Sequence, residues 1–244
     1  MALTGKTALI TGAARRVGRA IALELADAGC DVAVHYNTSR QEAVAVRDQI
    51  AAGGRRCCLV QGDLADPDAP RRVVAAAVEA LGSLDILINN AAIFTRMSLA
   101  DFEADTWQRT LQINLTAVAA LCHHAQPHLN KGSPGKIVNL CDIAADRPWK
   151  GHLAHCVSKA GLVCLTKALA RELAPTIQVN GVAPGIAVFP DDYDQQTRDR
   201  LVARVPLGRA GSPEEVAAAV RFLVEHGHYV TGQIINIDGG RSIV

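Results

Sequence analysis

Short apolar segments alternate with longer amphipathic segments along almost the whole chain. The apolar segments are five to eight residues long and rich in Val, Ile and Leu, which is the pattern of buried β-strands. They cover residues 7–11, 31–36, 57–61, 85–89, 135–141, 177–184 and 233–238. The pattern therefore predicts a sheet of seven strands.

Segments with helical periodicity stand between these strands. They run from the glycine-rich turn to about residue 28, and over residues 39–52, 67–81, 105–128, 151–173, 195–203 and 212–225. Strands that alternate with helices predict a doubly wound α/β fold of the Rossmann type, a parallel sheet with helices on both faces. No linker or repeat interrupts the pattern, so we expect one domain over residues 1–244.

One stretch after the sixth predicted strand lacks periodicity. It reads GIAVFPDDYDQ over residues 185–195 and is followed by the short helix. A long irregular loop at the carboxyl edge of such a sheet is more often a substrate lid than a linker. We therefore expect a lid over about 185–205.

Composition argues against several classes of protein. The 244 residues are 49% hydrophobic and carry a net charge of +1, so no basic field indicates a nucleic-acid partner. No window approaches 18 uninterrupted apolar residues, and the N-terminus lacks a signal-peptide pattern. Seven cysteines without a Cys-x-x-Cys spacing favour reduced thiols over disulfides or structural zinc. We expect a cytoplasmic protein that binds no membrane and no metal.

A glycine-rich turn follows the first predicted strand. It reads TGAARRVG, residues 11–18, and leads directly into a helix. Gly12 permits a sharp turn, Gly18 permits close packing, and the helix N-terminus presents N–H groups to a pyrophosphate. The position at the first strand and helix of an alternating chain predicts a dinucleotide site.

The residues after the second strand indicate which dinucleotide binds. NAD sites place a carboxylate there for the ribose hydroxyls, whereas this chain has HYNTSR over residues 35–40. Arg16 lies inside the glycine turn, and Ser39 and Arg40 could also contact a 2′-phosphate. The sequence therefore favours NADP(H).

Further motifs make the chain resemble the short-chain dehydrogenase/reductase family over nearly its full length. They are Asp63 in QGDLAD, the segment Asn89–Ala92, Asn114 in QINLTA, and the pair Pro184–Gly185. The resemblance implies an NADP-binding oxidoreductase in which Asp63 bonds the adenine and Asn114 belongs to the proton relay. The residues expected to bind the cofactor are Gly12, Arg16, Val17, Gly18, His35, Tyr36, Asn37, Ser39, Asp63, Leu64, Asn90, Ala91, Lys159, Pro184 and Gly185.

Two positions depart from the family pattern. The family pair Tyr-x-x-x-Lys is His155-x-x-x-Lys159 here, and Asp142 replaces the family's serine thirteen residues before the tyrosine. The aspartate resembles the pteridine reductase branch of the family. By that resemblance the catalytic set is Asp142, His155, Lys159 and Asn114, and the substrate contacts are Phe94, Asp142 and Tyr193, with Phe94 stacked on a pterin ring.

Three interpretations remain open at this point. One is a reductase of reduced pterins or folates that uses Asp142 and water as acid, with His155 in support. Another is a reductase of ketones of the acyl or sugar type that uses His155 itself, whose ordinary pKa is about 6.5. The third is a catalytically silent NADP(H)-binding module. The family resemblance also implies a homotetramer assembled through the helices 105–128 and 151–173.

Overall fold

The sheet has seven parallel strands in the order β3-β2-β1-β4-β5-β6-β7. The computed structural model describes residues 3–129 and 134–244. The strands are β1 (Thr7–Ile10), β2 (Asp31–Tyr36), β3 (Cys57–Gln61), β4 (Ile86–Asn89), β5 (Gly135–Leu140), β6 (Ile177–Pro184) and β7 (Ile234–Ile237). The predicted sheet and its parallel pairing are therefore confirmed.

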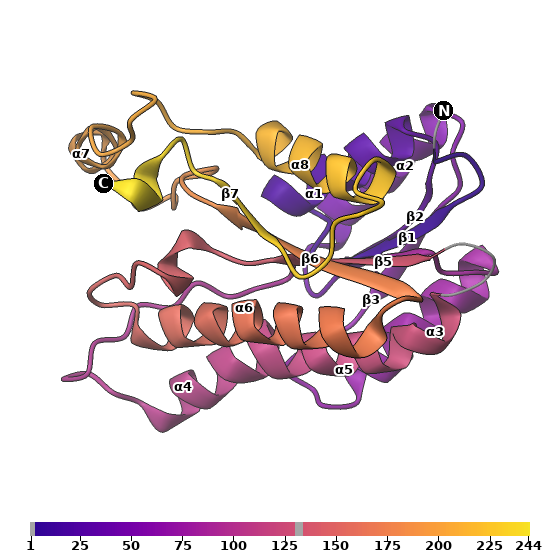
Figure 1. Ribbon diagram of the computed structural model, residues 1–244, viewed down its shortest axis with the longest axis horizontal. Coiled ribbons are helices and arrows are strands. Elements are labelled where there is room, and N and C mark those ends of the chain that lie inside the picture. Colours follow the sequence, from indigo (N-terminus) through magenta and orange to yellow (C-terminus); the bar gives the residue numbers. More distant parts are fainter. Residues whose placement is uncertain (1–2, 130–133) are drawn as a thin grey trace.

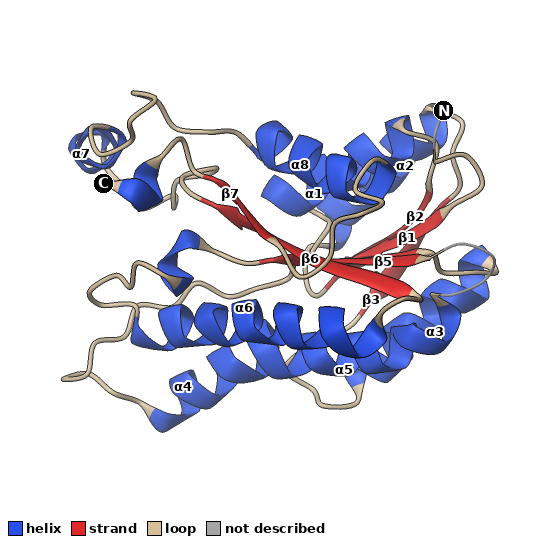
Figure 2. Cartoon of the chain, viewed as in Figure 1, coloured by secondary structure: helices blue, strands red, loops and turns tan. Residues whose placement is uncertain are grey.

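Helices cover both faces of the sheet (Figures 1 and 2). The helices α1 (Arg16–Asp27), α2 (Arg40–Ala52) and α8 (Pro213–Glu225) lie on one face. On the other lie α3 (Ala69–Leu81), α4 (Ala104–Leu111), α5 (Ala117–Ala125) and α6 (Leu153–Leu173). The short helix α7 (Gln195–Val202) stands apart from both layers, near the C-terminus (Figure 1).

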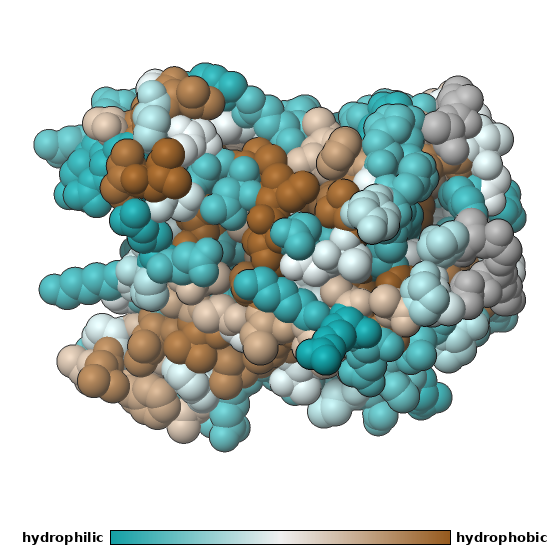
Figure 3. Space-filling view, viewed as in Figure 1, coloured by the Kyte–Doolittle hydropathy of each residue, from teal (hydrophilic) through white to brown (hydrophobic). Residues whose placement is uncertain are grey.

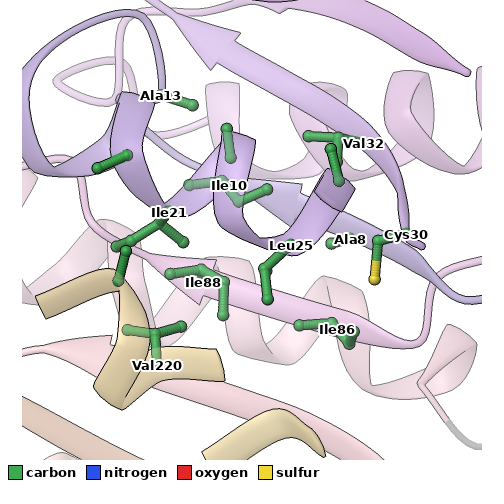
Figure 4. Packing of buried hydrophobic residues seen from close by; sticks show 14 of the residues in the cluster. Ala8, Ile10, Ala13, Ile21, Leu25, Cys30, Val32, Ile86, Ile88 and Val220 are labelled. Atoms are coloured by element: carbon green, nitrogen blue, oxygen red, sulfur yellow. The ribbon is translucent and has the colours of Figure 1, made fainter. Parts of the chain in front are cut away.

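Each helical layer buries its own apolar cluster against the sheet. Ile10 and Ile88 point from the central strands toward Ile21 and Leu25 of α1, and Val220 of α8 closes the cluster (Figure 4). Fully burying one such side chain stabilises the fold by about 1.5–3 kcal/mol. This packing fixes the carboxyl ends of the strands relative to one another.

The strand order reverses at β1, which pairs with β2 on one side and β4 on the other. The loops after β1 and β4 therefore diverge and leave a crevice at the carboxyl edge of the sheet. The glycine turn follows β1, and Asn90 follows β4. The topology thus brings two segments about 80 residues apart to one place.

The long helix expected over residues 105–128 is not one continuous α-helix. After α4 the chain forms a π-helical turn, Gln112–Thr116, then α5, and it ends in a 3-10 turn over Gln126–His128. The π-turn makes room for one extra residue, and such turns often occur at functional sites. Asn114 lies within it.

Two other boundaries differ from expectation near the carboxyl edge. Strand β5 ends at Leu140, so Cys141 and Asp142 lie beyond it, and Asp142 caps a 3-10 turn over Ile143–Ala145. Helix α6 begins at Leu153 rather than at Gly151. The Asp142 carboxylate accepts a hydrogen bond from the Ala144 N–H, which explains why the strand stops there.

Helix α6 is the only one in the described part of the chain with the length and composition of a membrane span, at 21 residues and a mean hydropathy of 1.3. The core helix of a soluble protein has the same features, and α6 packs along β6 with His155, Lys159 and Thr166 buried. Packing against the sheet accounts for the buried part of its apolar composition, which is 44% of that window.

Candidate active site

A cavity of about 610 Å³ opens at the carboxyl ends of the strands. It is lined by every residue predicted to bind the cofactor, by the three predicted substrate contacts, and by His155 and Lys159. Asn114 is the one predicted site residue that does not line it. The structure therefore brings together residues spread over more than 180 positions of sequence.

The glycine turn is held by the loop after β4. Gly12 has a φ of +63°, and its carbonyl and that of Thr11 accept hydrogen bonds from the Asn90 side chain at 3.1 and 2.8 Å. A Cβ at Gly18 would lie 2.2 Å from the Gly12 carbonyl oxygen, so only glycine fits there. The first turn of α1 has no side-chain cap and no acidic residue, which leaves its N–H groups for a pyrophosphate.

Arg16 occupies an unusual backbone conformation. Its φ is +51°, the only positive value among the described non-glycine residues. The family pattern has a glycine at this point, and glycine adopts the left-handed conformation easily. Here Arg16 adopts the same conformation in place of that glycine. The guanidinium is half exposed and pairs with Asp191 of the predicted lid at 2.9 Å.

His35 is buried and bridges two loops. Its Nδ1 accepts from the Gly12 N–H at 3.1 Å, which leaves Nε2 to donate to the Gly62 carbonyl at 3.1 Å. Burial lowers the pKa of His35 to about 4, so the ring is neutral near pH 7. The neutral His35 ring therefore links the glycine turn to the loop after β3.

Asp142 and His155 form the chemical centre of the cavity. The His155 Nε2 lies 3.3 Å from the Asp142 Oδ2, while Oδ1 accepts from the Ala144 N–H at 2.8 Å. His155 is almost fully buried, and its Nδ1 has no hydrogen-bond partner among the described residues. The ring therefore meets the rest of the site through Asp142, the more exposed of the two side chains.

Cys141 precedes Asp142 but differs in character. Its thiol is buried, and burial raises its pKa to about 11. A thiol with so high a pKa is not a nucleophile at neutral pH. Of the two neighbours, only Asp142 offers a group that can exchange protons.

Lys159 and Asn114 form buried hydrogen bonds that hold the segments around the site. The Lys159 ammonium is buried and donates to the Leu140 carbonyl at 2.6 Å; burial lowers its pKa. The Asn114 side chain accepts from the Ile93 N–H and donates to the Ile93 carbonyl and the Ser158 hydroxyl. The π-turn thus ties the loop after β4 to α6.

Aromatic rings form the far wall of the cavity. Phe94 stacks on His152 with centroids 4.4 Å apart and meets His155 edge-to-face at 4.9 Å, and 44% of Phe94 remains exposed. Trp149 lies parallel to His155 at 6.3 Å and lines the cavity. Tyr193 lies in the segment predicted to be a lid, and the Arg96 guanidinium carbon lies 5.5 Å from the centroid of its ring.

Sequence reasoning missed Trp149 and His152. Both lie in the irregular segment between Asp142 and His155, where no periodicity indicates which side chains face the cavity. The available signal was the position of a tryptophan, one of two in the chain, within the stretch that joins two catalytic candidates. Within the described ranges, no three His, Cys, Asp or Glu side chains gather as a metal site would require.

The arrangement suits hydride transfer from a dinucleotide. The uncapped turn of α1 can hold a pyrophosphate, Arg16 and Ser39 can hold a phosphate on the adenosine ribose, and Lys159 can bond the other ribose. The Asp142–His155 pair and the aromatic side chains of the cavity wall lie beyond that ribose. The residues present thus fit an NADP molecule across the cavity.

Comparisons with known proteins agree with this geometry. A family model described as enoyl-(acyl carrier protein) reductase matches residues 12–242. The chain is 36% identical to the 3-oxoacyl-[acyl-carrier-protein] reductase FabG of Staphylococcus aureus, over 96% of this chain and 97% of that one.

Solved structures are equally close. A short-chain dehydrogenase from Burkholderia cenocepacia in complex with NADP has a TM-score of 0.93 and 40% identity, with 99% of each chain covered. FolM alternative dihydrofolate reductase 1 from Brucella canis, complexed with NADP, has a TM-score of 0.93 and 31% identity, with 99% of this chain and 96% of that one covered. The chain therefore belongs to the short-chain dehydrogenase/reductase family and is an NADP-dependent oxidoreductase.

Proposed function

We propose that this enzyme uses NADPH to reduce a dihydropterin or dihydrofolate to the tetrahydro form. The observation that carries the proposal is the carboxylate of Asp142, 3.3 Å from the His155 imidazole, where the family pattern has two hydroxyl groups. A carboxyl group paired with an imidazole is a proton donor suited to a ring nitrogen. The pair lies beside Phe94, whose exposed part suits a flat heterocycle.

The reaction needs one hydride and one proton. Bound NADPH supplies the hydride to the carbon of the substrate's C=N bond, and the adjacent nitrogen takes the proton. Asp142 delivers that proton, directly or through one water, and the His155 Nε2 lies within reach to replenish it. Lys159 orients the cofactor, and Asn114 holds the loop that carries Phe94.

The similar proteins found by comparison favour two different substrate classes. FolM, named as an alternative dihydrofolate reductase, favours the pterin or folate class. FabG, named as a 3-oxoacyl reductase, favours a ketone. Asp142 and His155 favour the pterin or folate class, because a ketone oxygen is ordinarily protonated by the family's tyrosine, which this chain lacks.

The roles of individual cofactor contacts belong to the same proposal. Arg16 and Ser39 bind the 2′-phosphate, Asp63 bonds the adenine, and residues 185–205 close over the substrate as a lid. Two ion pairs support the lid assignment, since Asp191 pairs with Arg16 and Asp192 pairs with Arg96 across the cavity mouth.

We also propose that the enzyme is cytoplasmic and assembles as a homotetramer. Apolar side chains gather over α6 and the start of α4, at the lower left of Figure 3, and Val157 of α6 is 42% exposed. Strand β7 lies at the open edge of the sheet, with its isoleucines only partly buried. Two separate apolar surfaces are what two different subunit contacts would require.

Substrate-dependent oxidation of NADPH tests the function. The purified enzyme is supplied with dihydrofolate, dihydrobiopterin or an acetoacetyl thioester, and NADPH absorbance is followed. Consumption with either pterin, well above that with the thioester, is the expected result. Preference for the thioester would establish the ketone alternative, and tight NADPH binding without any turnover would establish a silent binding module.

A further inference from the structure

Arg241 is an arginine without a hydrogen-bonded counter-ion among the described residues, and it lies against Trp149, a side chain of the cavity wall. It begins the C-terminal 3-10 turn, Arg241–Ile243, and its guanidinium carbon lies 5.4 Å from the centroid of the Trp149 ring. No described residue forms a hydrogen bond or ion pair with this guanidinium. Stacking on an aromatic face leaves the N–H donors of the guanidinium edge available.

The lack of a partner is unusual for an arginine that is only partly exposed. Arg221, also partly buried, pairs with both Glu24 and Glu225. The carboxylate nearest to Arg241 in sequence, Asp238, is occupied by the backbone N–H groups of Gly240 and Ser242 at 2.9 and 2.7 Å. Burial lowers the pKa of Arg241, and the negative groups around it, Asp142 first among them, oppose that shift without forming a hydrogen bond to the guanidinium.

The surroundings connect this charge to the substrate site. Trp149 lines the cavity, and the groups that interact electrostatically with Arg241 include Asp142 and Tyr193, both of which also line it. The guanidinium stacks on the Trp149 ring, and the backbone N–H of Trp149 donates to the Cys156 sulfur at 3.3 Å. The C-terminus beyond it is tied down by Arg147, which donates to the Val244 carbonyl at 2.9 Å.

We propose that Arg241, held by Trp149, binds a carboxylate on the tail of the substrate. The inference rests on the proposed function: a flat ring bound against Phe94, with its reacting nitrogen at Asp142, lies beside Trp149, and the guanidinium stacked on Trp149 is placed to meet a substituent of that ring. A guanidinium fork matches a carboxylate in two parallel hydrogen bonds. The site therefore selects a pterin bearing an aromatic carboxylated tail, as in dihydrofolate, over one with a short neutral side chain.

Arg241→Met tests this assignment, because methionine keeps much of the length and removes the charge. Arg71→Met, at an exposed arginine of α3 outside the cavity, is the matched control. We expect Arg241→Met to lower kcat/KM for dihydrofolate by roughly tenfold or more, mainly through KM. The loss for dihydrobiopterin, which has no carboxylate, should be at least about fivefold smaller, and Arg71→Met should not change the ratio of the two substrates. Equal losses for both substrates, or none, would overturn the proposal.

Equilibrium binding separates this proposal from the proposed function. Folate and biopterin, which are not the reduced substrates, are titrated into the enzyme saturated with NADP⁺. Weaker folate binding in Arg241→Met, with no turnover by the unmodified enzyme, would retract the reductase function and keep the tail site. Folate binding that is identical in both proteins, or absent from both while biopterin binds, would overturn the tail site alone.

Discussion

At the scale of single residues, the proposed chemistry depends on two departures from the family pattern that lie against each other. Asp142 and His155 are thirteen positions apart and meet at 3.3 Å. Because His155 is buried and its Nε2 faces the Asp142 carboxylate, we propose that it positions that group and supplies its proton. The sequence could place both residues at the site, but it could not show that the second nitrogen of His155 has no partner.

Restoring the family's tyrosine should widen the range of substrates. In the pteridine reductases that the sequence resembles, reduction of an oxidised pterin relies on the tyrosine and reduction of a dihydropterin on the aspartate. We expect His155→Tyr to raise kcat/KM for oxidised pterins more than for dihydropterins, because a phenol reaches where the imidazole does not. His155→Phe, which has the ring without the hydroxyl, should show no such gain. Comparable efficiency of the unmodified enzyme on both substrate forms would contradict this account.

Arg16 should distinguish the two nicotinamide cofactors. Removing a charge-assisted hydrogen bond to the 2′-phosphate costs about 1–3 kcal/mol, so Arg16→Ala should weaken NADPH binding by that amount and leave NADH nearly unaffected. Arg19→Ala removes a nearby exposed arginine outside the cavity and should change neither affinity. Titration by intrinsic fluorescence measures the affinities for NADPH and NADH. An equal loss of affinity for the two cofactors would refute the 2′-phosphate assignment.

At the scale of secondary-structure elements, the site is assembled by loops that the packed strands hold in place. The alternation of apolar and amphipathic segments was sufficient to predict all seven strands and the main helices, because each element buries one periodic face. The π-turn over Gln112–Thr116 was not predictable, since it depends on the Asn114 side chain meeting the Ile93 backbone across the fold. Trp149 and Arg241 were missed for the same reason, as their contact joins segments about 90 residues apart.

The bridge from His35 to the glycine turn should make stability depend on pH. Burial lowers the folded-state pKa of His35 to about 4 from 6.5, so the unfolded chain binds one more proton between these values. The contribution of His35 is complete above pH 6.5 and is lost as pH falls toward 4. The expected slope is up to about 1.4 kcal/mol of unfolding free energy per pH unit.

His35→Gln supplies the comparison, because a glutamine amide can bond both Gly12 and Gly62 and does not titrate. Urea unfolding across this pH range should show a shallower slope for the variant, all other titrating groups being shared. Parallel slopes in the two proteins would show that His35 does not titrate as the structure indicates.

At the scale of the whole molecule, apolar surface remains outside the core. Val157 of α6 is 42% exposed, and Figure 3 shows apolar side chains gathered over this side of the molecule. A charge placed there would be buried without a partner in any assembly that covers this face. We expect the unmodified enzyme to have the mass of four chains by light scattering and Val157→Asp to have a smaller mass. Val44→Asp, on α2 at the other side of the sheet, should keep the full mass. A monomeric unmodified enzyme would contradict the tetramer.

The central claim is that Asp142 delivers the proton when a dihydropterin or dihydrofolate is reduced. The most direct measurement is the steady-state kcat of Asp142→Asn with dihydrofolate, beside Asp146→Asn, which makes the same change at an exposed position four residues away. Loss of a general acid costs roughly 100-fold or more in rate, so Asp142→Asn should fall by that factor while still binding NADPH, and Asp146→Asn should keep its rate. A kcat for Asp142→Asn equal to that of the unmodified enzyme would contradict the account.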